Sequence, residues 1–135
     1  MSGLFGALSV SGSGIDAADK WINTIAGNIA NANDTAPVTS GVYAAQAPVF
    51  TPITSTGQVG DGVAISSYQA GSSAGHIVED PTSPLADKNG EVRVSDVDIS
   101  AQMAGLIAAQ EAYQSNASAL SHAKQAYQSA LTLGS

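Results

Sequence analysis

The sequence has 135 residues, of which 44% are hydrophobic and only 11% are charged. This length and apolar share predict one folded domain with a core, rather than a disordered chain. Eleven acids against four bases give a net charge of −7, which argues against nucleic acid as a partner, because phosphate neutralisation needs clustered Lys and Arg. The sequence contains no cysteine, which excludes disulfides, thiolate metal sites and a cysteine nucleophile.

The sequence also limits how the protein reaches its location. No run of residues approaches the ~18 consecutive apolar positions that span a bilayer, so we expect no membrane insertion. No Lys or Arg precedes Lys20, which argues against a Sec signal peptide. A location outside the cytoplasm would therefore need another export route.

Residues 1–33 predict one amphipathic helix. Apolar residues recur there at alternating +4 and +3 spacing, which forms a heptad seam. The large members of this seam are Leu4, Leu8, Ile15, Ile22, Ile25 and Ile29, with Ser11, Ala18 and Ala32 at the remaining positions. Asn31, Asn33 and Pro37 supply stop signals. Several glycines each cost roughly 0.8–1 kcal/mol relative to alanine, so we expect this helix to be poor in isolation.

Residues 98–135 predict a second amphipathic helix with the same spacing. Its seam is interrupted by the polar residues Gln110 and Lys124, which either set register or, for Lys124, extend to solvent. The apolar members of this seam are Ile99, Met103, Leu106, Tyr113, Leu120, Tyr127 and Leu131. The run Ser95-Asp96-Val97-Asp98 predicts an N-terminal capping box.

Residues 34–97 contain all five prolines and predict a β-rich module. The runs at 42–50, 62–68, 76–78 and 91–94 are typical of short strands, and Asn89-Gly90 is the strongest hairpin signal. Seven acids and two bases lie in this segment, which therefore has a charge of −5. We predict an α+β fold in which helices 1–33 and 98–135 pair as a coiled-coil-like hairpin forming one helical assembly domain, with 34–97 as an outer module.

Each apolar band is wider than a contact between two helices can cover. Phe5 and Trp21 flank the first seam, and Ile107 flanks the second. Exposed apolar strips of this kind mark association surfaces, and contacts that repeat without closing form a filament. The alternative is that the middle module folds back over the strips to give a compact monomer.

Several motifs resemble those of the bacterial flagellar axial proteins, which form the rod and the hook. The run Asn28-Ile29-Ala30-Asn31-Ala32-Asn33 at the end of the first helix resembles their N-terminal signature. Ser83-Pro84-Leu85-Ala86-Asp87 and Gly90-Glu91-Val92-Arg93-Val94 resemble the segment before the C-terminal helix in the proximal-rod subclass. Tyr113-Gln114-Ser115-Asn116 fits the same family.

This resemblance implies a non-enzymatic structural subunit of the flagellar basal-body rod, without cofactor or metal. Such a subunit polymerises through its terminal helices with copies of itself and with paralogous rod subunits, and it meets inner-membrane ring and adaptor proteins. The resemblance also implies type III export without a cleaved signal and a place in the periplasm-spanning rod that drives motility. The alternative function is a soluble helical-hairpin adaptor acting as a discrete dimer.

Three candidate chemical sites have simpler explanations. Gly71-Ser72-Ser73-Ala74-Gly75 matches a nucleophile elbow, but an elbow needs a following helix, and strand-like residues follow instead. His76 and His122 share no ligand spacing, and helix capping explains Asp96 and Asp98 better than a cation site does. We therefore predict no catalytic residue and no metal ligand.

Asn28 and Asn31 allow two interpretations. Asparagine terminates helices because it bonds to local backbone groups. Alternatively, a polar residue within a seam can fix register across a subunit contact. We expect Asn31 to act as a cap, and for Asn28 both roles remain open.

Overall fold

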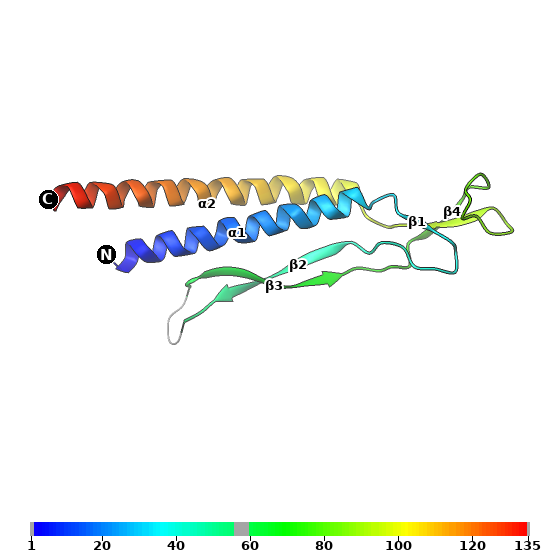
Figure 1. The fold of residues 1–135 in the computed structure, drawn as a ribbon, viewed down its shortest axis with the longest axis horizontal. Helices are drawn as coiled ribbons and strands as arrows, with labels where there is room; N and C mark the ends of the chain where they lie inside the picture. Colours follow the sequence, from blue (N-terminus) through cyan, green and yellow to red (C-terminus); the bar gives the residue numbers. More distant parts are fainter. Residues whose placement is uncertain (1, 56–59, 135) are drawn as a thin grey trace. The chain divides into compact units, whose positions relative to one another are not determined.

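The computed structural model describes residues 2–55 and 60–134. Two long helices enclose a β-rich segment in the sequence, which confirms the predicted α+β class (Figure 1). The elements are α1 (Ser2–Ala30), β1 (Thr35–Ala36), β2 (Gln46–Ile53), β3 (Gly62–Ala70), β4 (His76–Glu79), β5 (Glu91–Val94) and α2 (Ile99–Leu133). Neither helix, within these described ranges, combines the length and apolarity needed to cross a bilayer.

The chain divides into two compact units. Unit 1 consists of Met1–Ile22, Pro48–Ser67 and Ile107–Ser135, and unit 2 consists of Asn23–Ala47 and Tyr68–Leu106. Each unit combines a part of both helices with a part of the middle segment. The division into a helical assembly domain and an outer module stays a prediction about the assembled protein.

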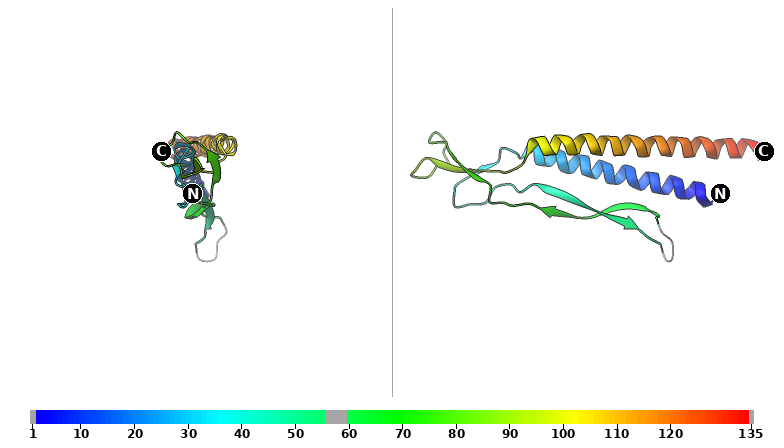
Figure 2. Two further views of the ribbon diagram at one scale, coloured as in Figure 1. Left: turned by 90° about the vertical axis from the view of Figure 1, so that its right-hand side faces the viewer. Right: turned by 180° about the vertical axis from the view of Figure 1, so that it is seen from behind.

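In unit 1 the two helices lie side by side, in the views of both Figure 1 and Figure 2. The rings of Phe5 and Tyr127 meet at a centroid distance of 5.8 Å. A Cβ atom at Gly14 would overlap the side-chain amide of Asn116, so glycine permits the close approach of the helices at this point. Ala18 and Ala109 are 3% and 0% exposed, which shows that small side chains fill the core of this unit.

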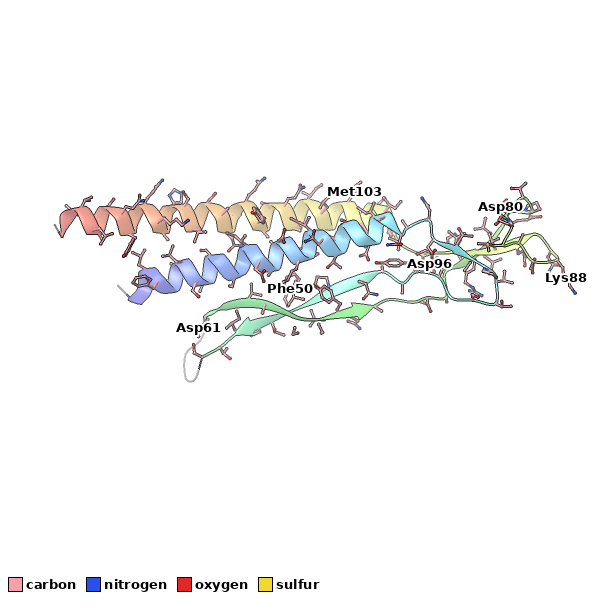
Figure 3. All side chains as sticks on the ribbon, in the orientation of Figure 1. Phe50, Asp61, Asp80, Lys88, Asp96 and Met103 are labelled. Atoms are coloured by element: carbon pink, nitrogen blue, oxygen red, sulfur yellow. The ribbon has the colours of Figure 1, made fainter. Side chains whose placement is uncertain are left out.

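The strands β2 and β3 form a two-stranded sheet. Most of this sheet belongs to unit 1, together with the first part of α1. The backbone N–H of Val63 donates to Ser13 Oγ at 3.1 Å. The ring of Phe50 meets Trp21 edge-on at a centroid distance of 5.5 Å (Figure 3). A hydrogen bond and an aromatic pair therefore fix this hairpin to the first helix.

The first predicted strand, over 42–50, is displaced toward the C-terminus and becomes β2. The cause is that two side chains accept hydrogen bonds from backbone N–H groups of the predicted segment. The N–H of Tyr43 donates to the Asp34 carboxylate at 2.7 Å, and the N–H of Gln46 donates to Asn28 Oδ1 at 2.8 Å. These bonds take up backbone donors that a regular ladder would use.

Unit 2 contains an antiparallel sheet with the strand order β1-β5-β4. Val92 in the central strand is 2% exposed. The two-residue strand β1 was not predicted, because so short a segment has no pattern to recognise. The hairpin signal at Asn89-Gly90 is confirmed, since β4 and β5 are consecutive antiparallel strands and Gly90 directly precedes β5. The two-residue turn is not formed: the connection runs over residues 80–90, and Gly90 has a φ of +80° whereas Asn89 has no positive φ. A type I′ turn needs positive φ at both positions.

The capping box predicted at Ser95 was also wrong, because the cap lies three residues later. The N–H of Ala101 donates to the Asp98 carboxylate at 3.1 Å, the geometry of an N-cap residue. Ser95 instead donates its hydroxyl to the carbonyl of Tyr43 at 2.9 Å. Its side chain therefore holds the sheet to the loop that precedes β2.

Two glycines of α1 offer a matched test of the close helix approach. Replacing either by alanine improves helix propensity by roughly 0.8–1 kcal/mol. Gly12→Ala meets no atom within 4 Å, so we expect it to raise the free energy of unfolding in urea by about that amount. Gly14→Ala must displace Asn116, and we expect a net loss of about 1–3 kcal/mol. Equal stabilisation by both substitutions would contradict the close approach.

Candidate functional site

The seam predicted on α1 faces the interior of the protein. Ile25 is 3% exposed, and the small seam residues Ser11, Ala18 and Ala32 are buried as well. The other large members of this seam are all partly exposed: Leu4, Leu8, Ile15, Ile22 and Ile29. The heptad pattern therefore identified the packed face of the first helix.

The seam predicted on α2 lies to one side of the face that packs. The buried residues of this helix are Ala109 and Ala123, which we call, together with the half-buried Asn116, the inner face of α2. Leu106, Leu120 and Tyr127 border it and are partly exposed. The other predicted members are exposed: Ile99, Met103, Tyr113 and Leu131.

In unit 1, α2 exposes large apolar side chains outside its inner face. Ile107 is 67% exposed and Leu131 is 52% exposed, and Tyr113 lies between them. We call these three residues the outer face of α2. In unit 2, Ile99 and Met103 are exposed on the first turns of the same helix (Figure 3). Large apolar side chains that stay exposed along a long helix are typical of an association surface.

The first turns of α1 combine exposed apolar residues with unexplained glycines. Phe5 is 53% exposed, and Cβ atoms at Gly3, Gly6 and Gly12 would meet nothing within 4 Å in the described chain. These glycines lower helix propensity without permitting any contact inside the described chain. At Gly14, by contrast, a Cβ atom would overlap the side-chain amide of Asn116.

Asn28 is 1% exposed and forms the centre of a polar network in unit 2. Its Oδ1 accepts from the N–H of Gln46 at 2.8 Å and from the hydroxyl of Tyr43 at 2.9 Å. Its Nδ2 donates to the carbonyl of Gln46 and to Gln102 Oε1, each at 2.8 Å. All four hydrogen-bonding positions of the amide are thus used within the chain. In this arrangement Asn28 positions the start of β2 and of α2.

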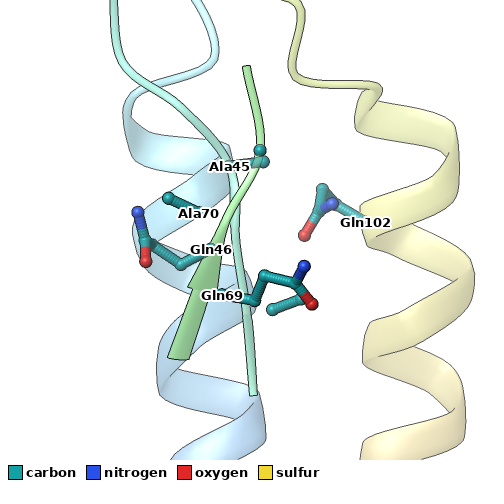
Figure 4. Close-up of a pocket in the computed structure, with 7 residues that line it drawn as sticks. Ala45, Gln46, Gln69, Ala70 and Gln102 are labelled. Carbon is teal, nitrogen blue, oxygen red and sulfur yellow. The ribbon is translucent and has the colours of Figure 1, made fainter. Parts of the chain in front are cut away.

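Sequence reasoning missed the partners of Asn28. A buried asparagine needs several polar neighbours, but nothing in the sequence indicates that Tyr43, Gln46 and Gln102 supply them. Gln46, Gln69 and Gln102 also line a shallow open groove of about 330 Å³ (Figure 4). The pockets that hold small molecules are usually well enclosed and mostly apolar. We therefore do not assign a ligand to this groove.

The remaining motif residues have local structural roles. Asn31 donates its side-chain N–H to the carbonyl of Gly27 at 2.8 Å just after α1 ends. The carbonyl of Asn33 accepts a hydrogen bond from the Thr35 hydroxyl. Gly90 packs against Pro81 with positive φ, while Pro84 and Leu85 are exposed in the preceding loop.

The suggested chemical sites lack the geometry that their chemistry needs. The strand β4 follows Ser73, where a nucleophile elbow needs a helix. His76 pairs with Asp96 at 2.7 Å, and His122 is exposed on α2. Among the described residues no three His, Asp or Glu side chains form a group that could hold a metal ion.

A comparison with known families defines the class of protein. The family model described as "Flagellar basal body rod FlgEFG protein C-terminal" matches residues 88–133. This range covers β5 and α2, the helix whose outer face is exposed.

Full-length relatives then define the family. The chain is 32% identical to "Flagellar basal-body rod protein FlgC" of Salmonella typhimurium over 131 residues, which cover 97% of this chain and 98% of the relative. It is 31% identical to the protein of the same name from Yersinia enterocolitica and 34% identical to that from Buchnera aphidicola subsp. Baizongia pistaciae, with the same coverage. The chain belongs to this family of flagellar basal-body rod proteins, which confirms the resemblance drawn from its motifs.

The network around Asn28 predicts a large effect of one isosteric substitution. Asn28→Asp replaces two donors by a buried carboxylate oxygen that faces the carbonyl of Gln46 and Gln102 Oε1. We expect the free energy of unfolding, measured by urea titration, to fall by about 3 kcal/mol or more. Asn33→Asp introduces the same charge at an exposed position and should change stability by less than about 0.5 kcal/mol. Similar effects at both positions would show that the network is not structural.

Proposed function

We propose that the chain is a structural subunit of the flagellar basal-body rod and assembles through the exposed apolar side chains of its terminal helices. The observation that supports this function is the outer face of α2 in a chain that belongs to the rod-protein family. A neighbouring helix that removes these side chains from water would stabilise the assembly by about 25 cal/mol per Å² of buried apolar surface. The side chains concerned are those of Ile107, Tyr113 and Leu131.

Assembly through helices also explains the composition of α1. A helix with glycines at uncovered positions is marginal on its own, and neighbouring subunits can approach those positions closely. Contacts that repeat from subunit to subunit without closing produce a tube or filament. Close-packed helices would give this tube the stiffness to transmit torque, so the role is mechanical and breaks no covalent bond.

The proposed partners are copies of this chain, paralogous rod subunits, and the inner-membrane ring and adaptor proteins of the basal body. The protein would leave the cytoplasm through the flagellar type III export apparatus without a cleaved signal and reside in the periplasm-spanning rod. The relatives, all named as rod proteins, give no support to the alternative of a dimeric adaptor.

Ile107→Asp tests assembly separately from folding. Because Ile107 is 67% exposed, we expect the free energy of unfolding of the isolated chain to change by less than about 0.5 kcal/mol. A charge on the outer face should nevertheless block packing of a neighbouring helix, and swimming of cells that carry only this variant should be lost. Ile25→Asp separates the two effects poorly, because Ile25 is 3% exposed.

The matched control is Ile107→Val, which keeps an apolar side chain at the same position. We expect these cells to swim like the wild type and to contain complete rods in electron micrographs. Normal swimming with Ile107→Asp, at equal protein level, would contradict assembly through the outer face of α2.

A further inference from the structure

The strand β4 forms an open edge of the sheet in unit 2. It pairs with β5 along one side, in the register His76↔Val94 to Glu79↔Glu91. No strand of the described chain pairs with its other side. An edge strand with free backbone groups is a template for adding another strand.

The hydrogen-bond pattern shows which groups point outward. The N–H of Asp80 donates to the carbonyl of Gly90 at 2.8 Å. Hydrogen-bonded and non-hydrogen-bonded pairs alternate in an antiparallel ladder. The next hydrogen-bonded pairs are therefore Val78 with Val92 and His76 with Val94. The backbone N–H and C=O groups of Ile77 and Glu79 therefore face away from β5. The N–H of Ser95 donates to the carbonyl of Asp34 on the other side of β5. This bond agrees with the same alternation, in which the residues of β5 bond by turns to β1 and to β4.

The side chains of β4 are uncovered as well. All four residues are exposed, including Ile77 at 45% and Val78 at 38%. Successive strand residues point to opposite faces, so each face of β4 exposes an apolar side chain. An added strand with apolar residues in alternate positions would cover one of these faces.

The charge around β4 indicates what kind of strand fits. Glu79 lies directly opposite Glu91, which is an unfavourable cross-strand pair. Neither carboxylate forms a salt bridge within the described chain. Arg93, on the same face, is committed elsewhere: its guanidinium donates to the carbonyls of Val38 and Ala74. Asp80 follows the strand at once (Figure 3).

We propose that β4 takes up an extended segment of another protein that alternates lysine or arginine with apolar residues. Its backbone would pair with the outward groups of Ile77 and Glu79, and its basic side chains would neutralise Glu79 and Glu91. A second copy of this chain fits poorly, because unit 2 carries seven acids and two bases, a charge of −5. This edge is distinct from the outer face of α2, so either surface can fail its test while the other passes.

A blocked hexapeptide of alternating valine and lysine tests the proposal on the dilute full-length chain. Amide hydrogen exchange measured by NMR should slow at least fivefold for Ile77 and Glu79 at saturating peptide, because their N–H groups become bonded. The affinity should fall as salt rises. A peptide with glutamate in place of lysine should bind at least tenfold more weakly.

Three variants complete the experiment. Glu79→Gln combined with Glu91→Gln should weaken binding of the lysine peptide at least tenfold, while Glu111→Gln, at an exposed position in unit 1, should leave it unchanged. Ile77→Pro removes an outward N–H that β5 does not use and should abolish binding. The proposal is overturned by no binding at millimolar peptide, by binding without slowed exchange at Ile77 and Glu79, or by equal affinity for the acidic peptide.

Discussion

The close approach of α1 and α2 in unit 1 constrains the rest of the structure. A Cβ atom at Gly14 would overlap the side-chain amide of Asn116 and would have to displace it. Ala18 and Ala109 are almost fully buried, so the core of this unit holds small side chains. Small residues let two helices approach closely, but they bury little apolar area. The large residues, Ile107 above all, then remain outside.

This arrangement links packing to function. A protein that buried its largest apolar residues would be complete as a monomer, whereas we propose that neighbouring subunits cover the outer face of α2 in this chain. Family membership agrees with this use, since the relatives are rod proteins. Unit 2 contributes differently: Asn28 ties the end of α1 to the start of β2 and of α2 through three hydrogen bonds, and a fourth bond holds Tyr43.

Much of the fold could be predicted from the periodicity of apolar residues. Where that prediction was wrong, the reason is physical. The seam of α1 was assigned to the correct face because Ile25 and its neighbours repeat at heptad spacing. On α2 the prediction placed the large apolar residues on the packed face. In the structure the small residue Ala109 is buried there, whereas Met103 is exposed. The network around Asn28 depends on side chains far apart in sequence, which no local pattern contains.

The central claim is that neighbouring subunits cover the outer face of α2, and thiol labelling tests it most directly. The chain has no cysteine, so Ile107→Cys introduces a single thiol whose rate of reaction with a maleimide can be compared in the dilute chain and in isolated rods. Lys88→Cys, in the exposed loop before β5, serves as the reference. We expect the thiol at position 107 to react at least tenfold more slowly in rods, with little change at position 88. Equal rates at position 107 in both states would contradict the account.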